Sequence, residues 1–202
     1  CLAASRERMA RGQSEALTPM IGDVVRRAGV AFADIDAVAV TRGPGAFTGL
    51  RIGLAAARAL ALSLGKPCLG IGTFDALHTA AREQGCVAGR DALVVAVDSK
   101  RDELFVAVFD AGGMTLFDPA AVRADAVARR LPGLRKIAIV GDAGLAVADA
   151  LRSTFTVTHH AEIELPDPAV VARLGLAALS APENAPAVPV YLRPPDVTLP
   201  KK

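Results

Sequence analysis

Apolar residues recur with helical spacing between residues 13 and 28 of the chain. They occupy one stripe of a helix, formed by Ala16, Leu17, Met20, Ile21, Val24, Val25 and Ala28. This spacing predicts an amphipathic helix, and Gly29 predicts its end. Residues 34–40 then alternate between apolar and small or polar side chains, which is typical of a strand.

A second helix is predicted from about Thr48, as the N-cap, to Leu64, with Gly65 ending it. Small residues recur in it every four positions, at Gly49, Gly53, Ala57 and Ala61. Such a ridge permits another helix to approach closely. Arg51 and Arg58 lie seven positions apart on one face, which we expect to contact solvent or a partner.

The later pattern alternates between strands and helices, and this predicts two α/β lobes. Expected strands cover 68–72, 92–97, 103–110, 136–140 and 155–158, and expected helices cover 73–84, 118–131, 145–151 and 168–179. Thr73 or Asp75 is the expected N-cap of the first of these helices. We place the lobes at 1–88 and 89–180. The proline-rich tail, 181–202, is expected to complete the first lobe.

The composition argues against several classes of function. Hydrophobic residues make up 52% of the 202 residues, which predicts a sizeable core. A net charge of +2 and an aromatic content of 4% argue against a direct nucleic-acid-binding module. The three cysteines are expected to be reduced, buried thiols in a cytoplasmic protein. No apolar run reaches the roughly 18 residues needed to span a bilayer, so no membrane partner is expected.

A glycine-rich run, Thr41–Gly53, joins the first predicted strand to the second helix. Backbone N–H groups at such a turn can hold an anion, but the same glycines also permit a tight turn with close packing. The run lacks the Lys-Ser/Thr ending of a P-loop, and Gly43, Gly45 and Gly49 do not have dinucleotide-site spacing. Both interpretations remain open at this point.

No catalytic or metal-binding constellation is apparent. His78 stands alone, and His159 and His160 are adjacent, so we expect surface or loop histidines rather than metal ligands. The charged residues from Asp98 to Glu103 are expected to form a solvated hairpin tip between two strands.

The motifs Arg42–Gly53, Ala57–Ala61 and Pro67–Leu77 together resemble the bacterial TsaB (YeaZ) family. The resemblance extends to 12–20, 95–105 and 189–193, so it covers most of the chain. It implies an α/β fold of the actin-like type (ribonuclease-H-like, ASKHA), with two lobes and central mixed sheets. The family's first strand and hairpin are not found before Cys1, so the first lobe is expected to lack them. The family-signature turn consists of Arg42, Gly43, Pro44, Gly45, Phe47, Thr48 and Gly49.

The resemblance implies a non-catalytic scaffold in the synthesis of N6-threonylcarbamoyladenosine at position 37 of tRNAs that read codons beginning with A. The implied partners are TsaD, which binds the metal and transfers the group, and the ATPase TsaE. Homodimerisation through the same helical face is also implied, and tRNA is reached only through the complex. TsaD-like chains carry an H-x-x-x-H pair, whereas the corresponding stretch here, Gly70–Leu77, has no histidine. We therefore expect no intrinsic catalysis, metal or cofactor, with ATP or ADP bound only together with partners.

Two questions follow from these expectations. The helices at 13–28 and 48–64 are expected to lie side by side and to contact the partner through Leu17, Met20, Val24, Arg51, Ala57, Arg58 and Ala61. Alternatively, the apolar residues of both helices pack only within the core of this chain. The alternative function is an actin-like nucleotide hydrolase or kinase that holds phosphate at the Gly43–Gly49 turn.

Overall fold

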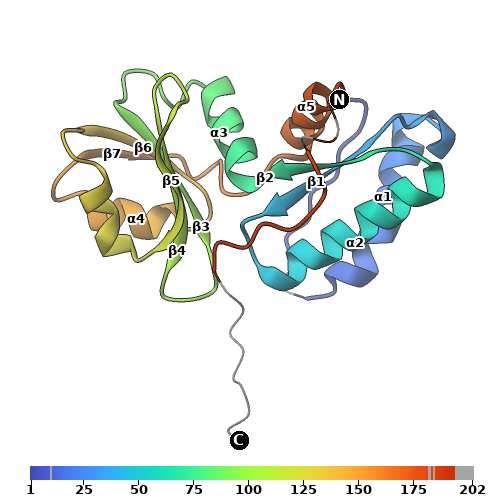
Figure 1. Cartoon of the computed structure of the whole chain (residues 1–202), viewed down its shortest axis with the longest axis horizontal. Coiled ribbons are helices and arrows are strands. Elements are labelled where there is room, and N and C mark those ends of the chain that lie inside the picture. The colour runs from blue at the N-terminus through green and yellow to red at the C-terminus, as the bar shows by residue number, and fades with distance from the viewer. Residues whose placement is uncertain (10, 182, 184, 194–202) are drawn as a thin grey trace, which may run out of the picture.

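The computed structural model describes residues 1–9, 11–181, 183 and 185–193. A five-stranded sheet forms one side of the molecule, and a two-stranded sheet forms the other side (Figure 1). Figure 1 shows α1 and α2 at the outer end of the two-stranded sheet and α3 between the sheets. Two α/β halves are thus present, as the alternation of the pattern predicts.

The first half has a parallel pair of strands, β1 and β2, joined by the long helix α2. A parallel pair needs such a crossover, and α2 packs along β1. Its elements are α1 (Gln13–Ala28), a 3₁₀ turn (Phe32–Asp34), β1 (Val38–Gly43), α2 (Phe47–Leu64), β2 (Cys68–Gly72) and α3 (Thr73–Glu83).

The second half is a mixed sheet with the strand order β5-β4-β3-β6-β7. Strands β3, β4 and β5 are antiparallel neighbours, whereas β3, β6 and β7 are parallel. Its elements are β3 (Ala92–Asp98), β4 (Leu104–Asp110), β5 (Thr115–Val122), a 3₁₀ segment (Ala124–Arg130), β6 (Lys136–Val140), α4 (Gly144–Leu151) and β7 (Thr156–His159). The last helix, α5 (Pro168–Ala178), follows β7 in the chain but packs on the first half.

The largest hydrophobic core surrounds the five-stranded sheet. Alternate residues of β3 point to opposite faces, so Val95 packs with residues of α3 while Val94 packs with residues of α4. The two-stranded sheet has much smaller buried clusters, one beneath α2 and one beneath α5. The second half therefore supplies most of the buried apolar surface that stabilises the fold.

The helix predicted over 118–131 is wrong. The structure has the edge strand β5, ending at Val122, and then a 3₁₀ segment. Strand β5 pairs with β4, and the register shifts between the pairs Val106–Ala120 and Val108–Phe117, the stretch of β5 that contains Pro119. Proline is tolerated in edge strands and at bulges because it cannot donate a ladder hydrogen bond. The alanine-rich sequence suits a helix, but pairing with β4 decides the outcome.

Two predicted helix starts are also corrected. Helix α2 begins at Phe47 after Ala46, so Thr48 lies inside its first turn rather than capping it. Helix α3 follows Gly72 directly, and neither Thr73 nor Asp75 is its N-cap. In contrast, Gly29 and Gly65 end α1 and α2 in the left-handed conformation, as predicted.

The chain returns to the first half after β7. Helix α5, which the sequence-based division placed with the second lobe, packs on β1 and β2, and Gly175 lies against Ala39 there. Residues 185–190 then follow the two strands, with an antiparallel bridge between Leu69 and Pro186 and a hydrogen bond from the Val190 amide to the Arg42 carbonyl (2.7 Å). The rest of the predicted tail, 194–202, lies outside the described residues.

Helix α2 is unusually long and apolar. It has 18 residues with a mean hydropathy of 1.3, so by length and composition it could cross a membrane, but helices of water-soluble proteins meet the same criterion. The prediction that no apolar run is long enough to span a membrane is therefore wrong by length and composition, although Arg51 and Arg58 lie within this helix. Only four of its 18 residues, Leu50, Leu54, Ala57 and Ala61, are fully buried within the chain. Helix α2 therefore presents apolar surface to the outside.

Candidate functional site

The signature turn is packed against the C-terminal segment. Gly43 has a φ of +107°, and a Cβ atom there would lie 2.7 Å from the carbonyl oxygen of Val190. Both Gly43 and Pro44 are buried, and the peptide bond between them is cis. The glycine is thus required by close backbone packing and by positive φ. The tight-turn interpretation of Gly43 is correct.

Three exposed side chains form a small cluster where α2 begins. The guanidinium of Arg51 lies 3.8 Å from the centroid of the Phe47 ring, and Arg51 Nε donates to the hydroxyl of Tyr191 (3.0 Å). The rings of Phe47 and Tyr191 are 5.6 Å apart and tilted by 34°. The hydrogen bond to Tyr191 and the contact between the two rings hold the C-terminal segment on α2, while the cation–π contact fixes Arg51 against Phe47 within the helix. Tyr191 was not among the predicted site residues, although it lies within the 189–193 motif.

The outward surface of α2 is lined by residues spaced four, three and four apart. All four are exposed, and Leu62 is 84% exposed. We call this line the outer face of α2, and it consists of Arg51, Ala55, Arg58 and Leu62. Arg51 and Arg58 were predicted interface residues. Ala55 and Leu62 were missed, although the same helical spacing could have found them.

The structure corrects two other predicted interface residues. Ala57 and Ala61 are only 7% and 2% exposed. They share the side of α2 that packs inward with Leu54. A ridge of small residues permits close packing, but here the close neighbour is the chain itself. Ala57 and Ala61 therefore pack within the core of this chain, as the alternative interpretation predicts.

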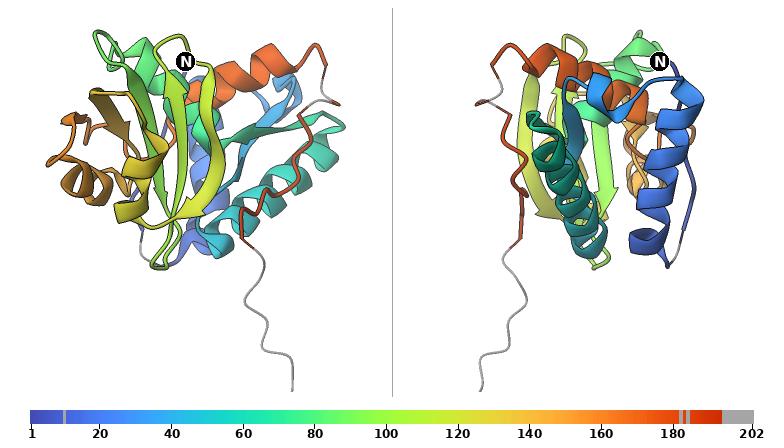
Figure 2. Two further views of the ribbon diagram at one scale, coloured as in Figure 1. Left: turned by 60° about the vertical axis from the view of Figure 1, so that its left-hand side comes forward. Right: turned by 90° about the vertical axis from the view of Figure 1, so that its right-hand side faces the viewer.

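Helix α1 lies beside α2 and contains no fully buried residue. In Figure 2 (right), which looks onto this end of the molecule, both helices face the viewer. The predicted residues Leu17, Met20 and Val24 are half-buried. They line an apolar cavity of about 470 Å³ between α1, the segment at 1–5 and α5. The first helix is therefore attached to the molecule by an incomplete apolar contact.

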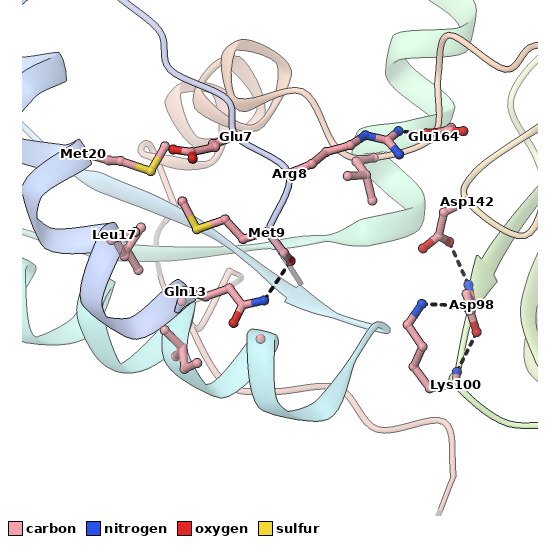
Figure 3. Close-up of a pocket in the computed structure, with 15 residues that line it drawn as sticks. Glu7, Arg8, Met9, Gln13, Leu17, Met20, Asp98, Lys100, Asp142 and Glu164 are labelled. Atoms are coloured by element: carbon pink, nitrogen blue, oxygen red, sulfur yellow. Dashed lines mark hydrogen bonds and ion pairs between the residues drawn. The ribbon is translucent and has the colours of Figure 1, made fainter. Parts of the chain in front are cut away.

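A larger cavity, of about 780 Å³, separates α1 and α2 from the second half of the molecule (Figure 3). Leu17, Met20 and Gly49 line its first side, and an ion pair between Arg8 and Glu164 lies at its edge. Three charged side chains reach it from the ends of β3 and β6, namely Asp98, Lys100 and Asp142. The hairpin tip predicted to be solvated thus contributes Asp98 and Lys100 to this interlobe cavity.

These charged groups are coupled. Partial burial favours the neutral form of Asp98, but hydrogen bonds from the Lys100 ammonium (2.5 Å) and amide (2.6 Å) outweigh it and lower the pKa of Asp98. Burial is the largest influence on Asp142 and raises its pKa, although the Asp98 amide donates to it (2.8 Å). The ionised form of Asp142 is therefore destabilised in the cavity by the loss of its hydration.

We expect Asp142→Asn to change the pH dependence of stability. A carboxyl whose pKa is raised in the folded state stabilises the fold below its unfolded pKa, and that contribution is lost as pH rises through the folded pKa. Asparagine keeps the acceptor for the Asp98 amide but not the charge. Melting temperatures of both proteins, measured from about pH 7 to about pH 4, should show the variant's advantage shrinking as pH falls. Parallel curves would contradict the assigned shift.

The histidines are less exposed than predicted. The imidazole of His78 stacks on Phe109 with centroids 4.4 Å apart, and burial, followed by Arg82, lowers its pKa. The Nε2 atoms of His78, His159 and His160 are buried and have no hydrogen-bond partner among the described residues. They were expected in surface or loop positions because His78 stands alone and His159 and His160 are adjacent, and only the tertiary packing reveals that their side chains are partly buried.

The stretch Gly70–Leu77 forms the end of β2 and the start of α3. Phe74, Ala76 and Leu77 are buried in the core there. Asp75 is its one ionisable side chain and is exposed. The buried side chains of this stretch are thus mainly apolar, with Thr73 the polar exception.

A family model described as "TsaD: tRNA N6-adenosine threonylcarbamoyltransferase" matches residues 6–171. An uncharacterised protein of Mycobacterium tuberculosis (strain ATCC 25618 / H37Rv) is 37% identical over 191 residues, which are 93% of this chain and 78% of that protein. The tRNA threonylcarbamoyladenosine biosynthesis protein TsaB of Escherichia coli (strain K12) is 32% identical over 99 residues, 49% of this chain and 42% of that protein.

Two solved structures are similar over nearly the whole chain. YeaZ from Pseudomonas aeruginosa superposes with a TM-score of 0.74 at 27% identity, over 92% of this chain and 87% of that one. An uncharacterized protein with similarity to peptidase YEAZ, also from Pseudomonas aeruginosa, gives 0.73 at 28% identity, over 93% and 87%.

Proposed function

The chain belongs to the TsaB (YeaZ) group of the tRNA N6-adenosine threonylcarbamoyltransferase family, and we propose that it is a scaffold that binds a TsaD homologue. The fold is the α/β actin-like fold expected from the sequence, and the protein has a place in threonylcarbamoyladenosine synthesis. In this proposal, the scaffold supports modification of position 37 in cytoplasmic tRNAs that read codons beginning with A. The TsaE homologue joins the complex, and ATP or ADP binds only there.

One observation carries the proposal. Helix α2 has a mean hydropathy of 1.3, yet only four of its 18 residues are fully buried, and the neighbouring α1 has no fully buried residue. Two adjacent helices of this kind have apolar surface that a helical partner can cover, and its burial would drive association. Leu62 is 84% exposed at the C-terminal end of the outer face of α2, one turn from Arg58, and has the character of an interface anchor.

The absence of intrinsic catalysis is part of the proposal. The stretch that holds the histidine pair in TsaD-like chains packs Phe74, Ala76 and Leu77 into the core here. Apolar side chains offer a metal no ligand. The transferase chemistry is therefore assigned to the partner, and tRNA is reached through it.

The alternative of a phosphate-binding hydrolase or kinase has weaker support. The interlobe cavity is large enough for a small molecule and has Lys100 at its wall. However, the turn's Gly43 faces the carbonyl oxygen of Val190, an acceptor that would repel phosphate.

Co-purification tests the proposal. The chain is co-expressed with tagged TsaD and TsaE homologues from its own organism, and the eluted complex is sized by chromatography with light scattering. We expect a stoichiometric complex with TsaD. The scaffold proposal fails if, at micromolar concentration, the chain elutes as a homo-oligomer without the TsaD homologue. In that case the apolar surface of α1 and α2 serves self-association instead.

A further inference from the structure

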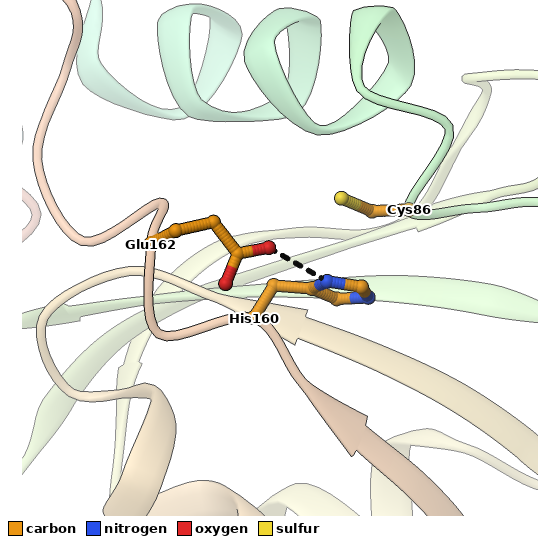
Figure 4. Close-up of side chains that lie close together, drawn as sticks. All are labelled: Cys86, His160 and Glu162. Carbon is orange, nitrogen blue, oxygen red and sulfur yellow. Dashed lines mark hydrogen bonds and ion pairs between the residues drawn. The ribbon is translucent and has the colours of Figure 1, made fainter.

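Three side chains with metal-binding chemistry lie together where the chain crosses between the two halves (Figure 4). Cys86 follows α3, the helix between the sheets, and precedes β3. His160 and Glu162 follow β7 and lead to α5, which packs on the two-stranded sheet. The three residues thus belong to the two connections through which the polypeptide leaves and re-enters the first half.

Their geometry is close to that of a metal site. One ligand atom of each residue, the Cys86 Sγ, an imidazole nitrogen of His160 and a carboxylate oxygen of Glu162, lies within 4.8 Å of the other two. His160 Nδ1 and Glu162 Oε1 are 3.0 Å apart. Tetrahedral zinc, with bonds of about 2.0–2.3 Å, separates its ligand atoms by about 3.3–3.6 Å. A movement of about 1 Å by the thiol would complete the arrangement.

The thiol and the imidazole are largely shielded from water. Cys86 is 7% exposed, and the His160 side chain is 20% exposed. The imidazole nitrogen that faces Glu162 is Nδ1, so Nδ1 is the His160 atom that would bind an ion together with that carboxylate. Glu162 is exposed, so an ion can reach the cluster from solvent.

We propose that Cys86, His160 and Glu162 bind a zinc ion that joins the two interlobe connections. Sulfur, imidazole nitrogen and carboxylate oxygen are the ligands that zinc prefers, and three protein ligands leave a fourth position for water. The ion stabilises the folded chain by binding it more tightly than the unfolded chain. This site is separate from the α1–α2 surface and takes no part in the transfer reaction.

Cobalt(II) is the spectroscopic probe for this site. The full chain, purified with chelator and then freed of it, is titrated with cobalt chloride under anaerobic conditions. We expect a sulfur-to-cobalt charge-transfer band and the visible bands of tetrahedral cobalt, and added zinc chloride should displace both. Zinc should also raise the melting temperature, and calorimetry in buffers of different ionisation enthalpy should register proton release.

Matched variants separate the site from other thiols and imidazoles. All are made in a Cys1→Ser background, because Cys1 is exposed. Cys86→Ser should abolish the charge-transfer band, and His160→Gln and Glu162→Gln should weaken zinc binding by more than about 100-fold and about 10-fold. Cys68→Ser and His159→Gln should change neither.

The proposal is overturned if the parent chain gives no charge-transfer band. It is equally overturned if Cys68→Ser removes the band, or if the exposed substitution Glu162→Gln, which leaves the core intact, has no effect on zinc affinity. Because Cys86→Ser alters a buried position, its melting temperature without metal is compared first, and the Glu162→Gln result decides if that variant does not fold.

Discussion

A Leu62→Asp variant is expected to bind the TsaD homologue at least about 30-fold more weakly than the wild-type chain. The side chain is 84% exposed on the outer face of α2, so its replacement leaves the chain's own core intact. In a complex, the same position would be buried, and an unpaired carboxylate there would remove an apolar anchor and add a desolvated charge. Truncation of an anchor at an interface typically costs about 2 kcal/mol or more.

Isothermal titration calorimetry with the purified TsaD homologue measures this effect. Leu145→Asp is the matched control, because Leu145 is 55% exposed on α4, in the other half of the molecule. The two variants should melt within a few degrees of the wild type, and only Leu62→Asp should lose affinity. Equal affinities for both variants would mean that the outer face of α2 is not the contact surface.

Gly141→Ala should lower the free energy of unfolding by about 3–5 kcal/mol. Gly141 follows β6 with a φ of +101°, and an added Cβ would lie 2.0 Å from the carbonyl oxygen of Ala96 in β3. The methyl group would force β3 and β6 apart at the centre of the five-stranded sheet. It would also displace Asp142, the next residue, from the Asp98 amide that donates to it.

Urea denaturation followed by circular dichroism gives the free energy. Gly65→Ala serves as the control, because Gly65 has a φ of +63° but no atom within 4 Å of the added Cβ. It should lose only about 1 kcal/mol, the penalty of the left-handed conformation alone. If the two variants lose the same amount, backbone strain rather than the Ala96 contact accounts for the effect.

The local elements were largely predictable from the sequence. Helix α1 has the predicted limits, because an apolar stripe and Gly29 together specify a helix and its end. The strand over residues 115–122 was missed because alanine-rich sequence favours a helix, and only pairing with β4 favours the strand. Long-range pairing of this kind has no local signal.

The candidate site was predictable only in part. Its helices and the charged pair Arg51 and Arg58 follow from the helical spacing. The burial of Ala57 and Ala61 within the chain does not, because a ridge of small residues permits close packing equally well against the same chain or against a partner. The cluster of Cys86, His160 and Glu162 arises from the crossing of two distant connections. Residue spacing along the sequence cannot predict that these two distant connections lie side by side.

Reconstitution of tRNA modification tests the central claim most directly. Unmodified tRNA is incubated with the threonylcarbamoyl donor, ATP and the TsaD and TsaE homologues, with the chain present, omitted, or replaced by Leu62→Asp, and the modified nucleoside is quantified by mass spectrometry. We predict full modification with the wild type, little with the variant or without the chain, and none with the chain as the sole protein. Modified adenosine formed by the chain alone, or an unchanged yield when it is omitted, would contradict the account.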